Sequence, residues 1–271
     1  MFTLEATEPI LDDVVACVRQ SHGVDFAGYR RGTLLRRLAF RMVRVGARSG
    51  AAYLRTLHEQ PVEVARLVEH LTVKVSRFYR NAPTFDAVRR LLPDLPGGAA
   101  GAPLRLWSAG CGNGEEAYTL AMLLDDRPGE VWGSDIDATA LAIARQGTYA
   151  THAIAELPEA LARRWLEPGQ AATVRVRDAL RARVRFVHHD LTAERAAPAA
   201  PYHLVCCRNV LIYLTPPVQR RVLEALVHSL VPGGILCLGE AEWIPPSLSA
   251  LTPVDHKRRI FRRAPSGDHA S

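Results

Sequence analysis

Long apolar runs are missing from this sequence. Its 271 residues are 48% hydrophobic and 23% charged, and no uninterrupted apolar stretch approaches the roughly 18 residues that cross a bilayer. The first ten residues include Glu5 and Glu8 but no basic residue, a composition that argues against a secretion signal. We therefore expect a cytoplasmic protein without membrane insertion.

Metal-ligand and disulfide patterns are missing as well. No C-x-x-C or mixed Cys/His spacing occurs among the five cysteines, and three of them fall in predicted core strands. Reduced, buried thiols are therefore favoured over a disulfide or a metal site. The five residues are Cys17, Cys111, Cys206, Cys207 and Cys237. We expect no bound metal.

Acidic residues are absent between Arg30 and Arg48. Apolar residues recur there at helical spacing and predict an amphipathic helix from Gly28 to Gly46. The opposite face carries arginines, and a stripe of one sign repels itself and has no i,i+4 partner. A solvated face is the simpler interpretation, but we favour a docking surface for an acidic partner, in keeping with the net charge of +6. The candidate docking residues are Arg37, Arg41 and Arg44.

The predicted elements divide the chain into two parts. Residues 1–92 predict helices throughout, and the turn-rich segment 93–103 predicts a linker between domains. Strand and helix patterns alternate over 104–271, which predicts an α/β domain with a doubly wound parallel sheet. An insertion at about 148–183 interrupts the alternation, and 253–263 predicts an antiparallel hairpin at the sheet edge.

A glycine turn between a strand and a helix is the centre of the second part. Residues 104–109 predict the strand, and Gly110 and Gly112 lie in the turn. In a parallel sheet this arrangement forms a nucleotide-type binding crevice. Glu115 and Glu116 occupy the first turn of the helix, where two carboxylates would repel a pyrophosphate. They would attract a ligand with an ammonium and a sulfonium, which predicts S-adenosylmethionine as the cofactor.

Polar residues also follow the other predicted strands. Asp135 ends the second strand, where its carboxylate would accept hydrogen bonds from both hydroxyls of a ribose. Asp190 and Leu191 follow another strand, and Asp190 would accept from an adenine amino group. Asn209 and Val210 follow the next. Because the carboxyl ends of parallel strands share one edge of a sheet, we expect these residues to line the cofactor site. The alternative for each is a turn residue bonded only to the backbone.

Four motifs carry a resemblance to a known family. They are L-T-V-K-V-S-R-F-Y-R at 71–80, W-S-A-G-C-G-N-G-E-E-A-Y-T-L-A at 107–121, S-D-I-D at 134–137 and C-R-N-V-L-I-Y-L at 207–214. With them the chain resembles the CheR family, the chemotaxis receptor glutamate methyltransferases. The resemblance implies a Rossmann-like S-adenosylmethionine-dependent methyltransferase domain, a small all-helical N-terminal domain and a short β-subdomain insertion.

The resemblance also implies a reaction. The methyl group would pass from S-adenosylmethionine to glutamates on the acidic methylation helices of a chemoreceptor cytoplasmic domain, in bacterial sensory adaptation, and S-adenosylhomocysteine would remain. Lys74 and Glu240 depart from the family pattern. The insertion is shorter than in members that bind a receptor's C-terminal pentapeptide, so we expect a pentapeptide-independent enzyme. The positions that match the family's cofactor and catalytic residues are Ser76, Arg80, Glu116, Asp135, Asn209, Val210 and Tyr213.

The expected chemistry is alignment rather than acid–base catalysis. A glutamate is already ionised at pH 7, so the enzyme must orient the reactants and remove water. Arg80 would orient the acceptor carboxylate through its planar fork, and Tyr213 would add one hydrogen bond. The alternatives are an inter-domain salt bridge for Arg80 and core packing for Tyr213.

Two other functions are compatible with parts of the sequence. A nucleic-acid methyltransferase would suit the basic charge, but the sequence lacks the Asp/Asn-Pro-Pro-aromatic run of adenine-N6 enzymes and the Pro-Cys of cytosine-C5 enzymes. A non-catalytic sensor or scaffold that binds S-adenosylmethionine would have no need for the retained Arg80. We expect no nucleic-acid partner, and we expect a monomer.

Overall fold

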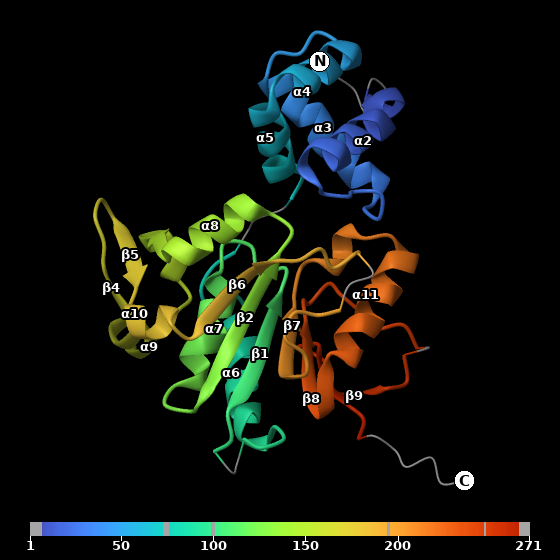
Figure 1. Cartoon of the computed structure of the whole chain (residues 1–271). Helices are drawn as coiled ribbons and strands as arrows, with labels where there is room; N and C mark the ends of the chain where they lie inside the picture. Colours follow the sequence, from blue (N-terminus) through green and yellow to red (C-terminus); the bar gives the residue numbers. More distant parts are fainter. Residues whose placement is uncertain (1–6, 73–75, 99–100, 194–195, 247, 266–271) are drawn as a thin grey trace. The chain divides into compact units, whose positions relative to one another are not determined.

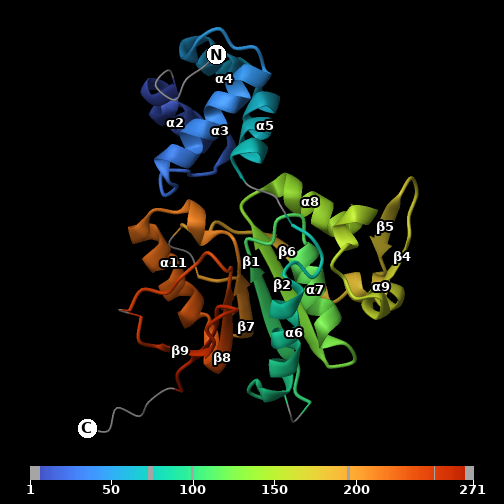
Figure 2. The ribbon, with the colours of Figure 1, turned by 180° about the vertical axis from the view of Figure 1, so that it is seen from behind.

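The chain folds into two compact units. The first comprises residues 1–74 together with 213–218, and the second comprises 75–212 and 219–271. Figures 1 and 2 show both units from opposite sides. The computed structural model describes residues 7–72, 76–98, 101–193, 196–246 and 248–265. No helix within these ranges is long and apolar enough to span a membrane.

The first unit is helical, as the sequence predicts. Gly23 has a φ of 75° and ends its first long helix, Ser49 Oγ accepts the N–H of Ala52 at 3.2 Å, and Pro61 begins its last helix. Each residue supplies a known start or stop signal. The elements are η1 (Glu8–Ile10), α2 (Leu11–His22), α3 (Arg31–Arg44), α4 (Gly50–Glu59) and α5 (Pro61–Leu71).

The apolar faces of these helices form the core of the first unit. Leu34, Leu38 and Met42 recur every fourth residue along α3, and each is at most 3% exposed. They pack with residues of α2 and α5, which both contact α3. Val45 lies just beyond the end of α3 and is 39% exposed. The amphipathic pattern is thus confirmed for the helix itself.

A seven-stranded sheet forms the centre of the second unit. Its order is β6-β2-β1-β7-β8-β10-β9. The neighbours from β6 to β8 are parallel, and β10 and β9 complete the edge as the predicted antiparallel hairpin. The strands are β1 (Leu104–Ala109), β2 (Gly129–Asp135), β6 (Val184–His188), β7 (Tyr202–Cys207), β8 (Leu230–Leu238), β9 (Leu251–Asp255) and β10 (Ile260–Arg263).

The strand order places a topological switch between β1 and β7. The chain moves from β1 towards β2 and β6 on one side, and from β7 towards β8 on the other. Ligands of open parallel sheets bind at such a point, beyond the carboxyl ends of the strands. Helix α7 packs on β1 and β2, and α8 packs on β2 and β6. The helices are α6 (Ala82–Leu91), η2 (Leu92–Asp94), α7 (Glu115–Leu124), α8 (Ala138–Gln146), η4 (Leu211–Tyr213) and α11 (Pro216–His228).

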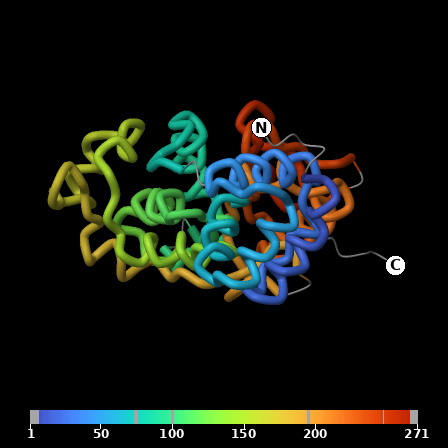
Figure 3. Tube along the Cα trace, turned by 90° about the horizontal axis from the view of Figure 1, so that it is seen from above, coloured from blue at the N-terminus to red at the C-terminus, as the bar shows by residue number. Residues whose placement is uncertain are grey.

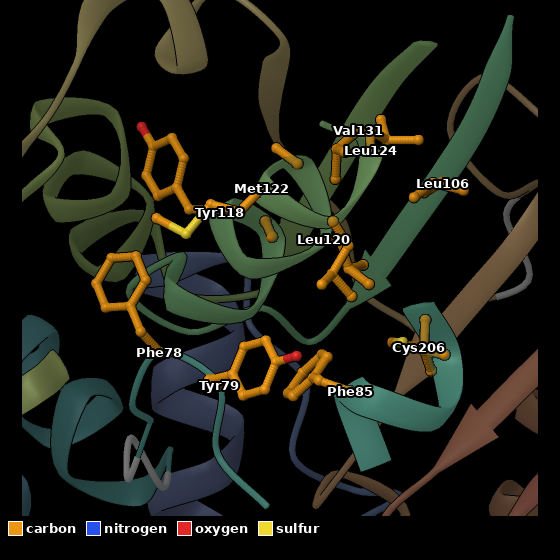
Figure 4. Packing of buried hydrophobic residues seen from close by; sticks show 14 of the residues in the cluster. Phe78, Tyr79, Phe85, Leu106, Tyr118, Leu120, Met122, Leu124, Val131 and Cys206 are labelled. Atoms are coloured by element: carbon orange, nitrogen blue, oxygen red, sulfur yellow. The ribbon is translucent and has the colours of Figure 1, made fainter. Parts of the chain in front are cut away.

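The division between the units lies nearer the N-terminus than the sequence predicts. It falls after residue 74, whereas the turn-rich segment 93–103 lies inside the second unit. Helix α6 accounts for the difference, because Phe85 and Val88 are buried in the same core cluster as β1 and α7. The ring of Tyr79 lies beside that of Phe85, with centroids 5.4 Å apart (Figure 4). The proline and glycine signal therefore marks a turn within this unit.

The insertion forms a small antiparallel sheet of its own, with the order β3-β5-β4. In Figure 3 it lies on the side of the second unit opposite the red C-terminal hairpin. Strand β5 lies between two strands of three residues each. The elements are β3 (Thr148–Ala150), η3 (Thr151–Ile154), α9 (Glu159–Trp165), β4 (Leu166–Pro168), β5 (Thr173–Val176) and α10 (Asp178–Arg181).

All five cysteines are buried and none forms a disulfide. Cys206 and Cys237 face each other across β7 and β8 as register partners, and burial raises the pKa of the Cys111 and Cys207 thiols. Protonated, inaccessible thiols do not act as nucleophiles. The predicted burial of the cysteine thiols is confirmed.

Candidate functional site

The glycine turn after β1 closes tightly against its neighbours. The N–H groups of Gly110 and Cys111 both donate to Ser134 O, at 2.8 and 2.9 Å. A Cβ at Gly110, whose φ is 75°, would lie 2.4 Å from Val210 Cγ2. Only glycine fits both this backbone conformation and this contact. The structure therefore brings together Gly110 and Val210, from the ends of β1 and β7.

Gly112 lies on the open side of the same turn. It has a φ of 55°, and no atom lies within 4 Å of the position that a Cβ would take. Its N–H donates to Asp135 Oδ2 at 2.8 Å. The turn is thus closed towards the sheet and open towards solvent, which permits a ligand to approach the backbone.

Asp135 connects the loop that follows β1 to the loop that follows β2. Its Oδ2 accepts from Gly112 and its Oδ1 accepts the N–H of Asp137 at 2.9 Å. A carboxylate at the end of the second strand is the group that accepts ribose hydroxyls in sites of this kind. The N–H of His189 donates to Asp135 O at 3.0 Å. Asp190, the next residue, is thereby placed at the same edge.

Asp190 is already hydrogen-bonded within its own loop. Its Oδ1 accepts from the N–H of Thr192 at 2.8 Å and from the Thr192 hydroxyl at 2.7 Å. This is the turn role that the sequence leaves open as an alternative, and it still leaves Oδ2 without a bond to Thr192. Leu191 is half-buried beside it.

The two glutamates at the start of α7 have different surroundings. Glu116 Oε1 accepts from the Ser108 hydroxyl at 2.8 Å, and Glu116 Oε2 lies 3.3 Å from Arg208 Nη1. Glu115 is 3% exposed, and burial raises the pKa of its carboxyl group although Ser76 hydrogen-bonds to it. Ser76, a predicted cofactor residue, thus contacts Glu115. Glu116 supplies an anchored carboxylate at the sheet edge.

Arg80 lies in the segment before α6, and Arg208 connects the backbone of this segment to Glu116. Arg208 Nη2 donates to Arg80 O at 3.1 Å and to Asn81 Oδ1 at 2.7 Å, while its Nη1 faces Glu116. Burial would lower the pKa of the Arg208 guanidinium, but the Glu116 carboxylate and the other neighbours together raise it. A continuous chain of contacts therefore joins Glu116 to the Arg80 segment.

Asn209 and Val210 are held by a carboxylate that the sequence motifs do not single out. Glu242 is 2% exposed, and it accepts N–H groups from Asn209, Val210 and Leu211 at 3.0, 2.8 and 2.7 Å. A fourth N–H, from Gly239, donates at 2.6 Å. Asn209 has a φ of 61°, a conformation that these bonds stabilise. In the sequence, the only feature that could have pointed to Glu242 is the four-residue run from Gly239, after β8, to Glu242.

Tyr213 belongs to the first unit in the structure. Its backbone oxygen accepts the N–H of Arg30 at 2.8 Å, and Leu214 forms a bridge with Tyr29. The place of Tyr213 beside the methyl group therefore stays a prediction. Glu240 accepts from Asn81 Nδ2 at 3.1 Å, and Lys74 lies outside the described residues.

The arginines of α3 do not form one exposed stripe. Arg41 is 8% exposed, and its Nε donates to Glu63 Oε1 at 2.8 Å. The Tyr53 hydroxyl donates to the same oxygen at 2.9 Å. Arg37 is half-buried and donates to the backbone oxygen of His70, whereas Arg44 is exposed. The prediction that Arg41 belongs to a docking surface is wrong, because Arg41 is buried and pairs with Glu63 of a different helix.

Comparison with known proteins places this arrangement in a family. The chain matches the all-alpha domain of the CheR methyltransferases over residues 11–72 and their SAM-binding domain over 74–260. It belongs to the CheR methyltransferase family. The chemotaxis protein methyltransferase of Klebsiella aerogenes is 32% identical over 236 residues, which are 83% of this chain and 80% of that protein.

Two further relatives are matched over very different shares of their own length. Chemotaxis protein methyltransferase 2 of Pseudomonas aeruginosa is 35% identical over 222 residues, or 77% of this chain and 76% of that protein. An uncharacterized 104.1 kDa protein of Rhodobacter capsulatus is 30% identical over 262 residues, or 93% of this chain but only 27% of that protein. The CheR unit therefore also occurs within a much longer chain.

S-adenosylmethionine, the cofactor of CheR methyltransferases, fits the residues present. The open backbone at Gly112 admits a ligand, and the carboxylates of Glu116 and Asp135 suit an ammonium and a ribose. The N-terminus of α7 carries two acidic residues and no basic one, which disfavours a pyrophosphate there. The structure thus agrees with the cofactor class that the sequence predicts.

Proposed function

We propose that this protein methylates glutamate side chains on the cytoplasmic helices of chemoreceptors, forming glutamate methyl esters during sensory adaptation. The relatives from Klebsiella and Pseudomonas are named as chemotaxis methyltransferases. The observation that carries the proposal is the placement of Arg80 on a segment that Arg208 ties to Glu116. An arginine at the methyl-donor edge is suited to an acceptor that is itself a carboxylate.

The residues of the site divide the work between holding the donor and aligning the acceptor. When bound, S-adenosylmethionine supplies an electrophilic methyl group on a sulfonium. Glu116 would hold the ammonium of the donor, and Asp135 would accept its ribose hydroxyls. Arg80 would orient the acceptor carboxylate in line with the methyl group. Because that carboxylate is already ionised, no residue has to remove a proton from it.

Recognition of the receptor is proposed for the exposed arginines of α3. Arg36 and Arg44 are exposed, and they would attract the acidic helices of a receptor at long range. The short insertion sheet, with strands of only three or four residues, supports recognition without a receptor pentapeptide. The protein would then locate its substrate through the first unit.

The proposal is tested by exchanging Arg80 for Ala. We expect turnover with a soluble receptor cytoplasmic fragment to fall by about 100-fold or more, because alignment of the acceptor is lost. Calorimetry with S-adenosylhomocysteine measures cofactor affinity separately, because Arg80 also matches a cofactor position of the family. Arg89→Ala, on the exposed face of α6, is the matched control and should leave both quantities unchanged. Near-normal turnover in Arg80→Ala would contradict the role of Arg80.

A further inference from the structure

Arg208 is a buried cation with three polar contacts from two directions. Its side chain is 3% exposed, and its guanidinium carbon lies 5.0 Å from the centre of the Phe85 ring. One end of the fork meets Glu116 Oε2 at 3.3 Å, and the other donates to Arg80 O and Asn81 Oδ1. A planar guanidinium can make such contacts at once, whereas an ammonium is a single point charge.

The segment that Arg208 reaches has an unusual backbone. Tyr79 and Asn81, on either side of Arg80, have φ values of 59° and 64°. A tyrosine rarely adopts the left-handed conformation, and it persists only where the surroundings enforce it. Two such residues in three positions indicate that the orientation of Arg80 is imposed by its neighbours.

Contacts from several elements enforce this conformation. The N–H of Tyr79 donates to Thr119 Oγ1 at 3.0 Å, and the Tyr79 hydroxyl donates to Asp86 Oδ1 at 2.8 Å. The N–H of Asn81 donates to Glu156 Oε2 at 2.8 Å. These bonds fix the segment to α7, α6 and the insertion. Arg208 adds the link to a carboxylate at the cofactor edge.

We propose that Arg208 is a positioning residue that ties the cofactor carboxylate Glu116 to the Arg80–Asn81 segment and so sets Arg80 for the acceptor. The proposal rests on the proposed function of Arg80. Arg208 pairs with the Glu116 carboxylate and, through the same guanidinium, fixes the backbone that carries the acceptor-binding side chain. Without the forked guanidinium of Arg208, Glu116 and the Arg80–Asn81 segment would both remain but would no longer be held together.

The test is Arg208→Lys, which keeps the charge but removes the fork. We expect kcat with a receptor cytoplasmic fragment to fall by about tenfold or more, while the receptor KM and the dissociation constant for S-adenosylhomocysteine change by less than about threefold. In an Arg80→Ala background, the same exchange should lower kcat by less than about twofold, because both changes remove one function. Hydrogen exchange should accelerate at residues 79–84 and not at 104–109.

A matched control and a second variant keep the test decisive. Arg105 also joins a carboxylate, Glu130 Oε1 at 2.8 Å, to a backbone oxygen, Ala199 O at 2.8 Å, and Arg105→Lys should leave kcat unchanged. Asn81→Gly keeps the left-handed backbone and the N–H but removes Asn81 Oδ1, one of the two acceptors of Arg208 Nη2 in this segment. It should lower kcat in the same direction, and it decides the question if Arg208→Lys does not fold.

Three results would overturn the positioning role. They are an unchanged kcat in the folded variant, an equal loss with and without Arg80, and a loss explained entirely by weaker cofactor binding. Failure of the proposed function is distinct from all three. In that case Arg80→Ala alone retains turnover, while hydrogen exchange at 79–84 still reports whether Arg208 fixes the segment.

Discussion

Glu115 shows how one residue at this site couples protonation to folding. The residue is 3% exposed at the start of α7, and burial raises the pKa of its carboxyl group above the ordinary value of 4.5. A group with a raised folded-state pKa contributes stability below its unfolded pKa and loses that contribution as the pH rises through the folded pKa. The buried Glu115 carboxyl group should therefore lower the free energy of unfolding at neutral pH.

Glu115→Gln should stabilise the protein at pH 8 and change it little at pH 5. The amide keeps the shape and can still accept from Ser76, but it carries no charge to desolvate. We expect a gain on the order of 1 kcal/mol, or about 2–4 °C in melting temperature, at pH 8. Thermal melts of both proteins at the two pH values measure it. Glu159→Gln, exposed on α9, should show no such pH-dependent gain; an equal gain at both pH values would argue against a titrating Glu115.

Individual residues differ in how far the sequence reveals them. Gly110 and Asp135 are predictable, because a glycine turn and a carboxylate at strand ends occupy fixed places in a parallel sheet. The close approach of Val210 to Gly110, which leaves no space for a Cβ, depends on a strand order that the sequence does not state. Glu242 escaped prediction because its partners are backbone N–H groups, which leave no trace in residue types.

At the scale of elements, α3 has a more specific surface than its sequence suggests. The absence of acidic residues within the helix predicts a continuous basic stripe, yet Arg41 turns inward to Glu63 of α5. Spacing within one helix reveals only i,i+3 and i,i+4 partners. A partner from a second helix requires the packing of the whole unit. Arg36 and Arg44 keep the exposed positions.

Charge reversal of Arg36 and Arg44 together tests α3 as the docking element. We expect the KM for a receptor cytoplasmic fragment to rise by about three- to tenfold at low salt, and the difference to shrink as salt is added. Affinity for S-adenosylhomocysteine should not change. Arg41→Ala is the contrasting variant: it should destabilise the first unit by about 3 kcal/mol, because Glu63 is left buried and unpaired. An unchanged KM in the double variant would show that α3 presents only a solvated face.

The short elements and the boundary between units resist prediction for a related reason. Strands β3 and β4 have three residues each, too few for an alternating pattern to emerge. Helix α6 continues the helical run of the first unit in sequence but contributes Phe85 to the core of the second. The alternation of longer strands and helices beyond residue 104 is the part that sequence alone predicts well.

At the scale of the whole molecule, our proposal assigns cofactor binding and partner selection to different units. The second unit holds the glycine turn, the carboxylates and Arg80, and it matches the SAM-binding domain of the CheR methyltransferases. The first unit matches their all-alpha domain and carries the exposed arginines of α3. We propose that both units serve one reaction, methylation of receptor glutamates.

The most direct test is to locate the transferred methyl group. The whole protein would be incubated with S-adenosylmethionine carrying a deuterated methyl group and with a receptor cytoplasmic fragment, and the products mapped by peptide mass spectrometry. We predict label on glutamate side chains, released as methanol by mild base, because a carboxylate acceptor gives a methyl ester. Base-stable label on another side chain, label in added nucleic acid, or no label at all would contradict methylation of receptor glutamates.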